Sequence, residues 1–427
     1  MSIIADVFCS MWDEHSHSWT IVDIEGCLAN GPLSGWEEVL LLANDQVDSA
    51  WQGSALEALR MCLAIDFSLG KAHPGRSSHT SIGIFRSYTL AHFEKSDLSG
   101  LGTPGALLFR WATPQRNDQI AGAFTNVVRL QPDVVDLVDF ARMPWTLDCV
   151  PDTAATSLVA TLPMLEQNGD VRVQAVDDGR AWYRIEPVDA SIIGRIPAAL
   201  DALDASGATV GVLPEESLSQ ALLEAWIAAV GQRKRPRGSN LAWIVVGTGP
   251  LTDEDPPDNT AVIISRRDGT ILLKQRKRHR YLLPMSTIAY WGLSLELGDS
   301  VDRDEYVTPG QRLCVLESLR GRCVVLVCED FGRMIPHGHE IAAVAPNLLL
   351  VPVLDRELDD TRWQAHAGKG WLDAVGAVAV VSNSLAIPRR MGQAGEVGCL
   401  MVIQPLSGVA VGTSPAALQA TSQPVDW

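Results

Sequence analysis

The sequence lacks any apolar run long enough to cross a membrane. Its longest apolar stretches, such as residues 374–381, are far shorter than the roughly 20 residues that a membrane-spanning helix needs. The start of the chain carries no basic leader and soon becomes acidic, which is unlike a secretory signal. We therefore expect a cytoplasmic protein that does not enter a membrane.

Closely paired cysteines are also missing. The eight cysteines are scattered between Cys9 and Cys399, and no two of them form a CxxC pair. A zinc site or a disulfide framework would need closer or more regular spacing, so the pattern indicates reduced thiols. His15 and His17 bracket a serine near the start of the chain, but such a pair is more typical of a solvated segment than of metal ligands. We expect no metal.

The chain has no excess of positive charge, no low-complexity tract and no repeat of fixed period. Lys and Arg number 34 against 51 Asp and Glu, which gives a net charge of −17. This balance disfavours nonspecific binding to nucleic acid or to an anionic membrane. One basic run, residues 274–280, could bind phosphate, but it has no interleaved aromatic residue before Tyr281. We expect no nucleic-acid partner.

The length of the chain and the difference in sequence pattern between its two halves indicate two domains. The 427 residues are 47% hydrophobic, which is ample for a buried interior and long for a single core. Residues 1–165 carry no chemical motif; we expect a mostly helical or mixed α/β domain there, with helices near residues 54–64 and 134–142. A cap, an oligomerisation element or a sensor would all fit it. Turn residues between Pro163 and Asp170 predict a boundary, after which residues 171–427 form the second domain.

In the second domain, apolar runs of strand length alternate with helical patterns, which predicts an α/β fold. The expected helices are residues 193–205, 217–230 and 368–375. The expected strands are residues 171–176, 209–213, 242–246, 261–265, 324–328, 348–353, 377–381 and 400–403.

Three segments place a reactive side chain at or just past the end of a strand. They are ATVGVLPEES with Glu215, DGTILLKQRKRH with Lys277, and CVVLVCEDFGR with Cys328. Each alone has a plain structural explanation: a helix start, a solvated basic loop and a buried small hydrophobe. Cys314 and Cys323 lie in apolar runs without acidic neighbours and are expected to be core thiols.

The order Glu, Lys, Cys, each in its own context, resembles the nitrilase (carbon–nitrogen hydrolase) superfamily over roughly residues 171–415. That family's pattern has a strand ending in Pro–Glu, a DG turn leading to Lys, and a strand ending in Cys-x-Asp. Further landmarks follow in family order: Asn259–Thr260–Ala261, Pro309–Gly310, LLLVP at 348–352, Trp363, VVSNS at 380–384, Gly398 and Gln404–Pro405.

The resemblance implies a four-layer α-β-β-α sandwich and hydrolysis of an amide or nitrile through a thioester. In this interpretation Cys328 is the nucleophile, Glu215 the base and Lys277 the group that stabilises the oxyanion. Many members have a second glutamate; Glu305, shortly before a PG turn, is the candidate, with Glu296 or Asp304 as alternatives. No organic cofactor is implied. Family members commonly dimerise, so a homo-oligomer is expected.

The chain also departs from the family pattern. Cys328 is followed by Glu329 and Asp330, where true nitrilases tend to have Cys–Trp–Glu and many amidases Cys–Tyr–Asp. Cys–Glu–Asp is closer to the glutaminase domain of glutamine-dependent NAD synthetases, but no synthetase domain is present. The substrate therefore stays open. Two alternatives to a hydrolase remain: a binding or regulatory protein that meets a partner through its N-terminal half, and an amidotransferase or acyltransferase module.

Overall fold

The computed structural model describes residues 107–109, 127–129, 132–142, 157–167, 169–252, 254–318, 321–334, 338–405 and 407–425. Nearly all of them belong to one compact unit, formed by Ser99–Asn117 and Val128–Trp427. The helix expected near residues 54–64, together with His15 and His17, lies outside the described residues. Within the described ranges, no helix is long and apolar enough to cross a membrane.

A six-stranded mixed sheet forms the first large layer. Its order is β10-β9-β8-β7-β4-β19, and β4, β7 and β8 run parallel to one another. The strands are β4 (Ser157–Thr161), β7 (Val210–Val212), β8 (Trp243–Val245), β9 (Thr260–Ser265), β10 (Ile271–Arg276) and β19 (Thr421–Val425). Every residue of β7, β8 and β9 is buried, as expected for strands covered on both faces.

A seven-stranded mixed sheet forms the second large layer, in the order β18-β17-β16-β15-β14-β13-β3. At its centre β14, β15 and β16 are parallel. The strands are β3 (Val138–Arg142), β13 (Leu313–Ser318), β14 (Gly321–Val325), β15 (Leu348–Val353), β16 (Val378–Asn383), β17 (Val397–Gln404) and β18 (Gly408–Ser414).

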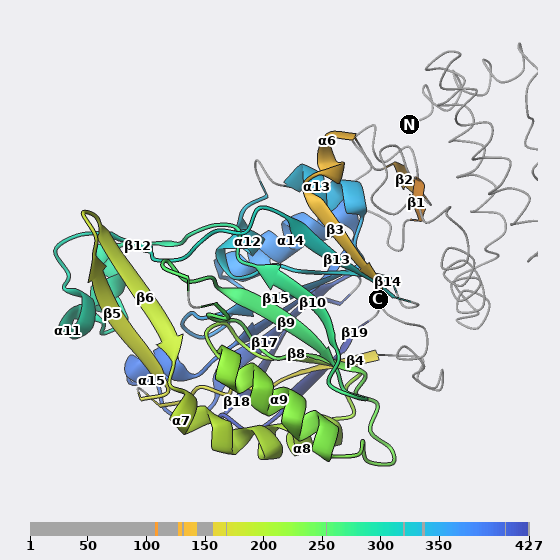
Figure 1. Cartoon of the computed structure of the whole chain (residues 1–427), viewed down its shortest axis with the longest axis horizontal. Coiled ribbons are helices and arrows are strands. Elements are labelled where there is room, and N and C mark those ends of the chain that lie inside the picture. Colours follow the sequence, from red (N-terminus) through yellow and green to blue (C-terminus); the bar gives the residue numbers. More distant parts are fainter. Residues whose placement is uncertain are drawn as a thin grey trace, which may run out of the picture. The chain divides into compact units, whose positions relative to one another are not determined.

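The two large sheets pack face to face, and helices cover their outer faces. The core between the sheets mixes side chains from both, such as Val212 and Ile263 from the first and Leu350 and Val380 from the second. Helices α8 (Ile196–Ala205) and α9 (Gln220–Gln232) pack on the first sheet, and α13 (Gly338–Val344) and α14 (Trp363–Val375) on the second. Figure 1 shows these helix pairs on opposite sides of the sheets.

A smaller four-stranded sheet, β11-β12-β6-β5, extends away from the large sheets (Figure 1). Its strands are β5 (Val171–Asp177), β6 (Ala181–Pro187), β11 (Leu282–Leu283) and β12 (Arg303–Glu305). The remaining elements are the pair β1 (Leu107–Phe109) and β2 (Val127–Arg129), a 3₁₀ turn at Ile193–Arg195, and short helices α6 (Pro132–Val135), α7 (Asp189–Ile192), α10 (Met285–Tyr290), α11 (Ser294–Leu297), α12 (Glu329–Gly332) and α15 (Ala386–Arg390).

The α/β class expected from the sequence is confirmed, but the expected boundary between Pro163 and Asp170 falls inside the compact unit. Strand β3 pairs in parallel with β13, and β4 lies between β7 and β19, so both large sheets begin before that point. The helix expected at residues 134–142 is also wrong: α6 ends at Val135 and β3 follows. The apolar spacing there reflects an edge strand, whose Val138 and Phe140 pack against one core and whose Ala141 packs against another.

Candidate active site

Glu215 follows β7 and connects the two large sheets. Its backbone N–H donates to Val353 O at 3.3 Å, and its Oε2 accepts a hydrogen bond from Leu354 N at 3.0 Å. Val353 ends β15, so a strand of the second sheet fixes a carboxylate that the first sheet delivers. Only 3% of Glu215 is exposed. The carboxylate is therefore buried and held in one orientation.

Lys277 lies one residue past the end of β10 and is as buried as the carboxylates beside it. Its Nζ donates to Glu215 Oε1 and to Glu305 Oε1, each at 2.8 Å. Burial favours the neutral amine, but the carboxylates of Glu215 and Glu305 raise the pKa of Lys277 well above its ordinary value. The side chain is therefore an ammonium ion held between two carboxylates.

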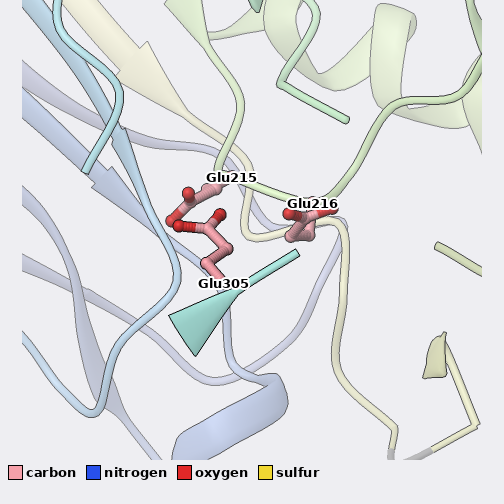
Figure 2. A group of neighbouring side chains, drawn as sticks. All are labelled: Glu215, Glu216 and Glu305. Carbon is pink, nitrogen blue, oxygen red and sulfur yellow. The ribbon is translucent and has the colours of Figure 1, made fainter. Parts of the chain in front are cut away.

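Glu305 is the last residue of β12, and its Oε2 accepts a hydrogen bond from Tyr281 N at 2.9 Å. Burial raises the pKa of Glu305, while the neighbouring Lys277 opposes that rise. Figure 2 shows the carboxylates of Glu215 and Glu305 turned toward each other. Glu296 and Asp304 were the other two candidates for the second carboxylate of the site. Glu296 pairs with Arg390 instead, at 2.6 Å. Asp304 precedes Glu305 on the strand, so its side chain points to the opposite face.

Cys328 follows the end of β14 and immediately precedes α12. The strand expected at residues 324–328 ends earlier, at Val325. The backbone of Cys328 has φ 48° and ψ −104°, a combination that only glycine adopts readily, and its N–H donates to Pro352 O at 3.0 Å. The surrounding fold therefore holds the residue in a strained turn, a feature common at functional sites.

The Cys328 thiol is neutral in the resting site. Burial, followed by the negative charge of Glu215, raises the pKa of Cys328 well above its ordinary value, while Lys277 opposes the rise. The thiol and Glu215 line the same cavity, so this carboxylate is placed to remove the proton of the thiol. Cys323 is a buried core thiol, and Cys314 is a partly buried one against the same core, as expected.

Asp330, on α12, connects the turn at Cys328 to the segment that follows Lys277. Its carboxylate accepts hydrogen bonds from Arg278 N at 3.0 Å, from His279 N at 2.9 Å, and contacts His279 Nδ1 at 2.8 Å. Arg278 in turn pairs with Glu340 at 2.5 Å. The basic run that could have been a solvated loop is thus anchored, which fixes Lys277 relative to Cys328.

Two further residues of the site were not predicted from the sequence. Asn259 Nδ2 donates to Glu215 Oε1 at 3.1 Å, to Glu216 Oε1 at 3.0 Å and to Glu305 Oε1 at 3.5 Å. Asn259 stands in a segment that the sequence marks only as a family landmark, and Glu216 is simply the residue after Glu215. No spacing signal marks either as a site residue, because their roles depend on loops meeting in space.

The three glutamates have carboxylate oxygens within 4.8 Å of one another, which is the spacing of metal ligands. However, the Lys277 ammonium and the Asn259 amide already donate to Glu215 and Glu305. The cluster is thus arranged around one protein cation, Lys277, and one neutral amide donor, Asn259.

Glu215, Glu216, Lys277, Glu305 and Cys328 all line one cavity of about 910 Å³. The structure therefore brings the four residues singled out from the sequence, Glu215, Lys277, Cys328 and Glu305, to one wall. A cavity of this size accommodates a small organic molecule. The arrangement offers a thiol, an adjacent carboxylate and a fixed ammonium, which is a set suited to acyl transfer chemistry.

No family model matches the chain, and no curated protein is similar to it. Solved structures of nitrilase-superfamily and carbon–nitrogen hydrolase proteins match about two thirds of it. A branch 10 nitrilase-superfamily protein of Saccharomyces cerevisiae shares 12% identity over 64% of this chain and 90% of its own, with a TM-score of 0.41. An amidase variant from Nesterenkonia shares 16% identity over 65% of this chain and 92% of its own, with a TM-score of 0.38. A carbon–nitrogen hydrolase from Helicobacter pylori shares 14% identity over 63% of this chain and 88% of its own, with a TM-score of 0.39. Function is therefore inferred from the geometry of the site.

Proposed function

We propose that this protein hydrolyses an amide-type carbon–nitrogen bond through a thioester on Cys328, and that its layered fold is a nitrilase-type sandwich. The observation that carries the proposal is the convergence of Cys328, Glu215 and Lys277 on one cavity, with the negative charge of Glu215 acting on the thiol and the Lys277 ammonium 2.8 Å from the same carboxylate. The order of these residues along the chain supports the same conclusion.

The first step is attack of sulfur on the carbonyl carbon. Because the Cys328 thiol is neutral at rest, its proton passes to Glu215 as the carbon–sulfur bond forms. The carbonyl π electrons move to oxygen, and the Lys277 ammonium stabilises the resulting negative charge. Preorganisation matters here, since the ammonium is already held by two carboxylates and does not have to move into place.

The second step releases the amine. The tetrahedral intermediate collapses, the carbon–nitrogen bond breaks, and the leaving nitrogen takes the proton from Glu215. Water then donates a proton to Glu215 as its oxygen attacks the thioester, and the proton returns to the sulfur as the acid leaves. The sum is amide plus water giving acid plus amine. Glu305 acts as a positioning residue, because it touches Lys277 rather than the reacting atoms.

Intact-protein mass spectrometry tests the proposal. Wild type and Cys328→Ala would be incubated with simple amides, nitriles and N-carbamoyl compounds, and both protein mass and released ammonia would be measured. We expect an acyl adduct or ammonia in wild type and neither in Cys328→Ala. A stable adduct with no acid released would favour the acyltransferase alternative. Neither signal with any compound would favour the binding or regulatory alternative, and equal activity of Cys328→Ala would exclude Cys328 as the nucleophile.

A further inference from the structure

Glu216 is a buried acid that the proposed reaction does not use. It lines the cavity, only 5% of it is exposed, and its backbone φ of 56° is unusual for a residue with a side chain. Its Oε1 accepts from Asn259, but among the described residues its Oε2 has no hydrogen-bond partner. A buried polar atom without a partner is destabilising, which suggests that a ligand supplies the missing donor.

The charge around Glu216 indicates which kind of ligand group would bind. Lys277 balances only one of the two carboxylates, Glu215 and Glu305, that bracket it. One carboxylate oxygen of Glu216 lies within 4.8 Å of an oxygen of each of these two carboxylates. Asn259 Oδ1, another buried acceptor, likewise lacks a partner among the described residues. An anionic substrate group would meet a surplus of acceptors there, whereas a group with several donors and a positive charge would be matched.

We propose that Glu216 is a specificity-determining residue that binds an ammonium or similar cationic group on the acyl part of the substrate. This inference rests on the proposed function, because it names the substrate class of the same site. The short separation between Glu216 and the carboxylates of Glu215 and Glu305 places the cation only a few atoms from the reacting carbon. The preferred substrates are therefore short amino-substituted amides.

Binding of such a substrate is coupled to pH. Burial, and then the charges of Glu215 and Glu305, raise the pKa of Glu216 well above its ordinary value, with Glu186 adding to the rise and Lys277 opposing it. A bound cation therefore competes with a proton on Glu216. Affinity for a cationic amide rises with pH toward the Glu216 pKa, as long as the ligand amine stays charged. Affinity for a neutral amide does not change in this way.

Two matched pairs of amides test the inference, since each pair differs only by an ammonium in place of a methyl group: β-alaninamide with butanamide, and 4-aminobutanamide with pentanamide. In at least one pair we expect wild type to show about tenfold higher kcat/KM for the amine. In Glu216→Gln the ratio should fall close to one. Glu186→Gln is the matched control and should keep the preference, because Glu186 already pairs with Arg184.

Calorimetry on Cys328→Ala separates this inference from the proposed function, because it measures affinity without turnover. We expect tighter binding of the amine than of the neutral amide, with an affinity that rises with pH toward the raised Glu216 pKa, and loss of that preference in Cys328→Ala/Glu216→Gln. If the preference is present but wild type hydrolyses no amide, the proposed function fails and the cation site stands. If the neutral amides bind equally well or better, or if Glu216→Gln keeps the preference, the inference is overturned whether or not hydrolysis occurs.

Discussion

Replacing Glu215 with Gln should separate the reactivity of the Cys328 thiol from catalysis. In wild type the charge of the carboxylate favours the neutral thiol, while Lys277 favours the thiolate. Glutamine keeps the shape of the side chain and removes the charge. The thiolate then faces the Lys277 ammonium without the opposing charge of Glu215. We therefore expect Glu215→Gln to lower the pKa of Cys328 and to abolish hydrolysis at the same time.

The size of the effect follows from the interaction between the thiol and the charge of Glu215, which this substitution removes. An interaction as strong as a hydrogen bond to a charged group contributes about 1.5–3 kcal/mol, so without it the thiolate-to-thiol ratio rises by a factor of about 10–160. A less basic thiolate is also a weaker nucleophile, with a Brønsted slope of about 0.45, which lowers the gain by a factor of roughly 3–10. Alkylation of Cys328 at pH 7.5 should thus be about 4–16 times faster than in wild type. Amide hydrolysis should fall at least about 100-fold, because the general base is gone.

The assay is iodoacetamide labelling followed by peptide mass spectrometry, which resolves Cys328 from the other cysteines. Cys328→Ala supplies the background, and Glu186→Gln controls for the loss of a cavity carboxylate that does not contact the thiol. Both Glu186→Gln and wild type should label slowly, with a rate that keeps rising as the pH is raised toward the high pKa of Cys328. Slower labelling of Glu215→Gln than of wild type, or retained hydrolysis in that variant, would refute the assigned role of Glu215.

Three further changes test other parts of the site. Glu305→Gln removes a charged hydrogen bond to Lys277, so kcat should fall about 10–100-fold, while KM should stay within about threefold of the wild-type value. Steady-state kinetics that show a raised KM at unchanged kcat would contradict a positioning role. Cys328→Gly should be more stable than Cys328→Ala by about 1 kcal/mol in urea unfolding. Glycine relieves a backbone strain of about 1–3 kcal/mol, and its extra conformational entropy in the unfolded chain costs about 0.5–1 kcal/mol. A less stable glycine variant would show that the turn is unstrained. Asp330→Ala leaves the partly buried N–H groups of Arg278 and His279 without an acceptor and should lower the free energy of unfolding by about 2–4 kcal/mol. A decrease below about 1 kcal/mol would mean that water or another group replaces the carboxylate.

The second glutamate illustrates how far sequence reasoning reaches. The sequence left Glu296, Asp304 and Glu305 as candidates, because all three carry a carboxylate shortly before the PG turn. The structure distinguishes them through strand alternation: on β12 the side chain of Glu305 is buried beside Lys277, while that of Asp304 lies on the other face. Glu296 belongs to α11 and pairs with Arg390 instead. Such a choice needs the register of the strand, which local composition does not supply.

The same limit explains the residues and elements that sequence reasoning missed. Glu216 and Asn259 meet only because the loop after β7 and the start of β9 lie together at the end of the first sheet. Strands β3 and β4 were not predicted from the sequence, because their pairing partners lie far along the chain, at β13 and at β7 and β19. Long-range pairing leaves no mark on a short window of sequence.

The sequence by itself determined the α/β class, the alternation of buried strands with amphipathic helices, and the three reactive side chains at strand ends. Those features are local: hydrophobic periodicity sets the element type, and turn residues set where each strand stops. Only the tertiary structure decided that Glu215, Lys277, Glu305 and Cys328 share one buried cavity, and that the Cys328 thiol stays neutral beside a charged ammonium. The protonation state of a buried group depends on its distance to other charges and on its access to water, and both arise only when distant segments pack together.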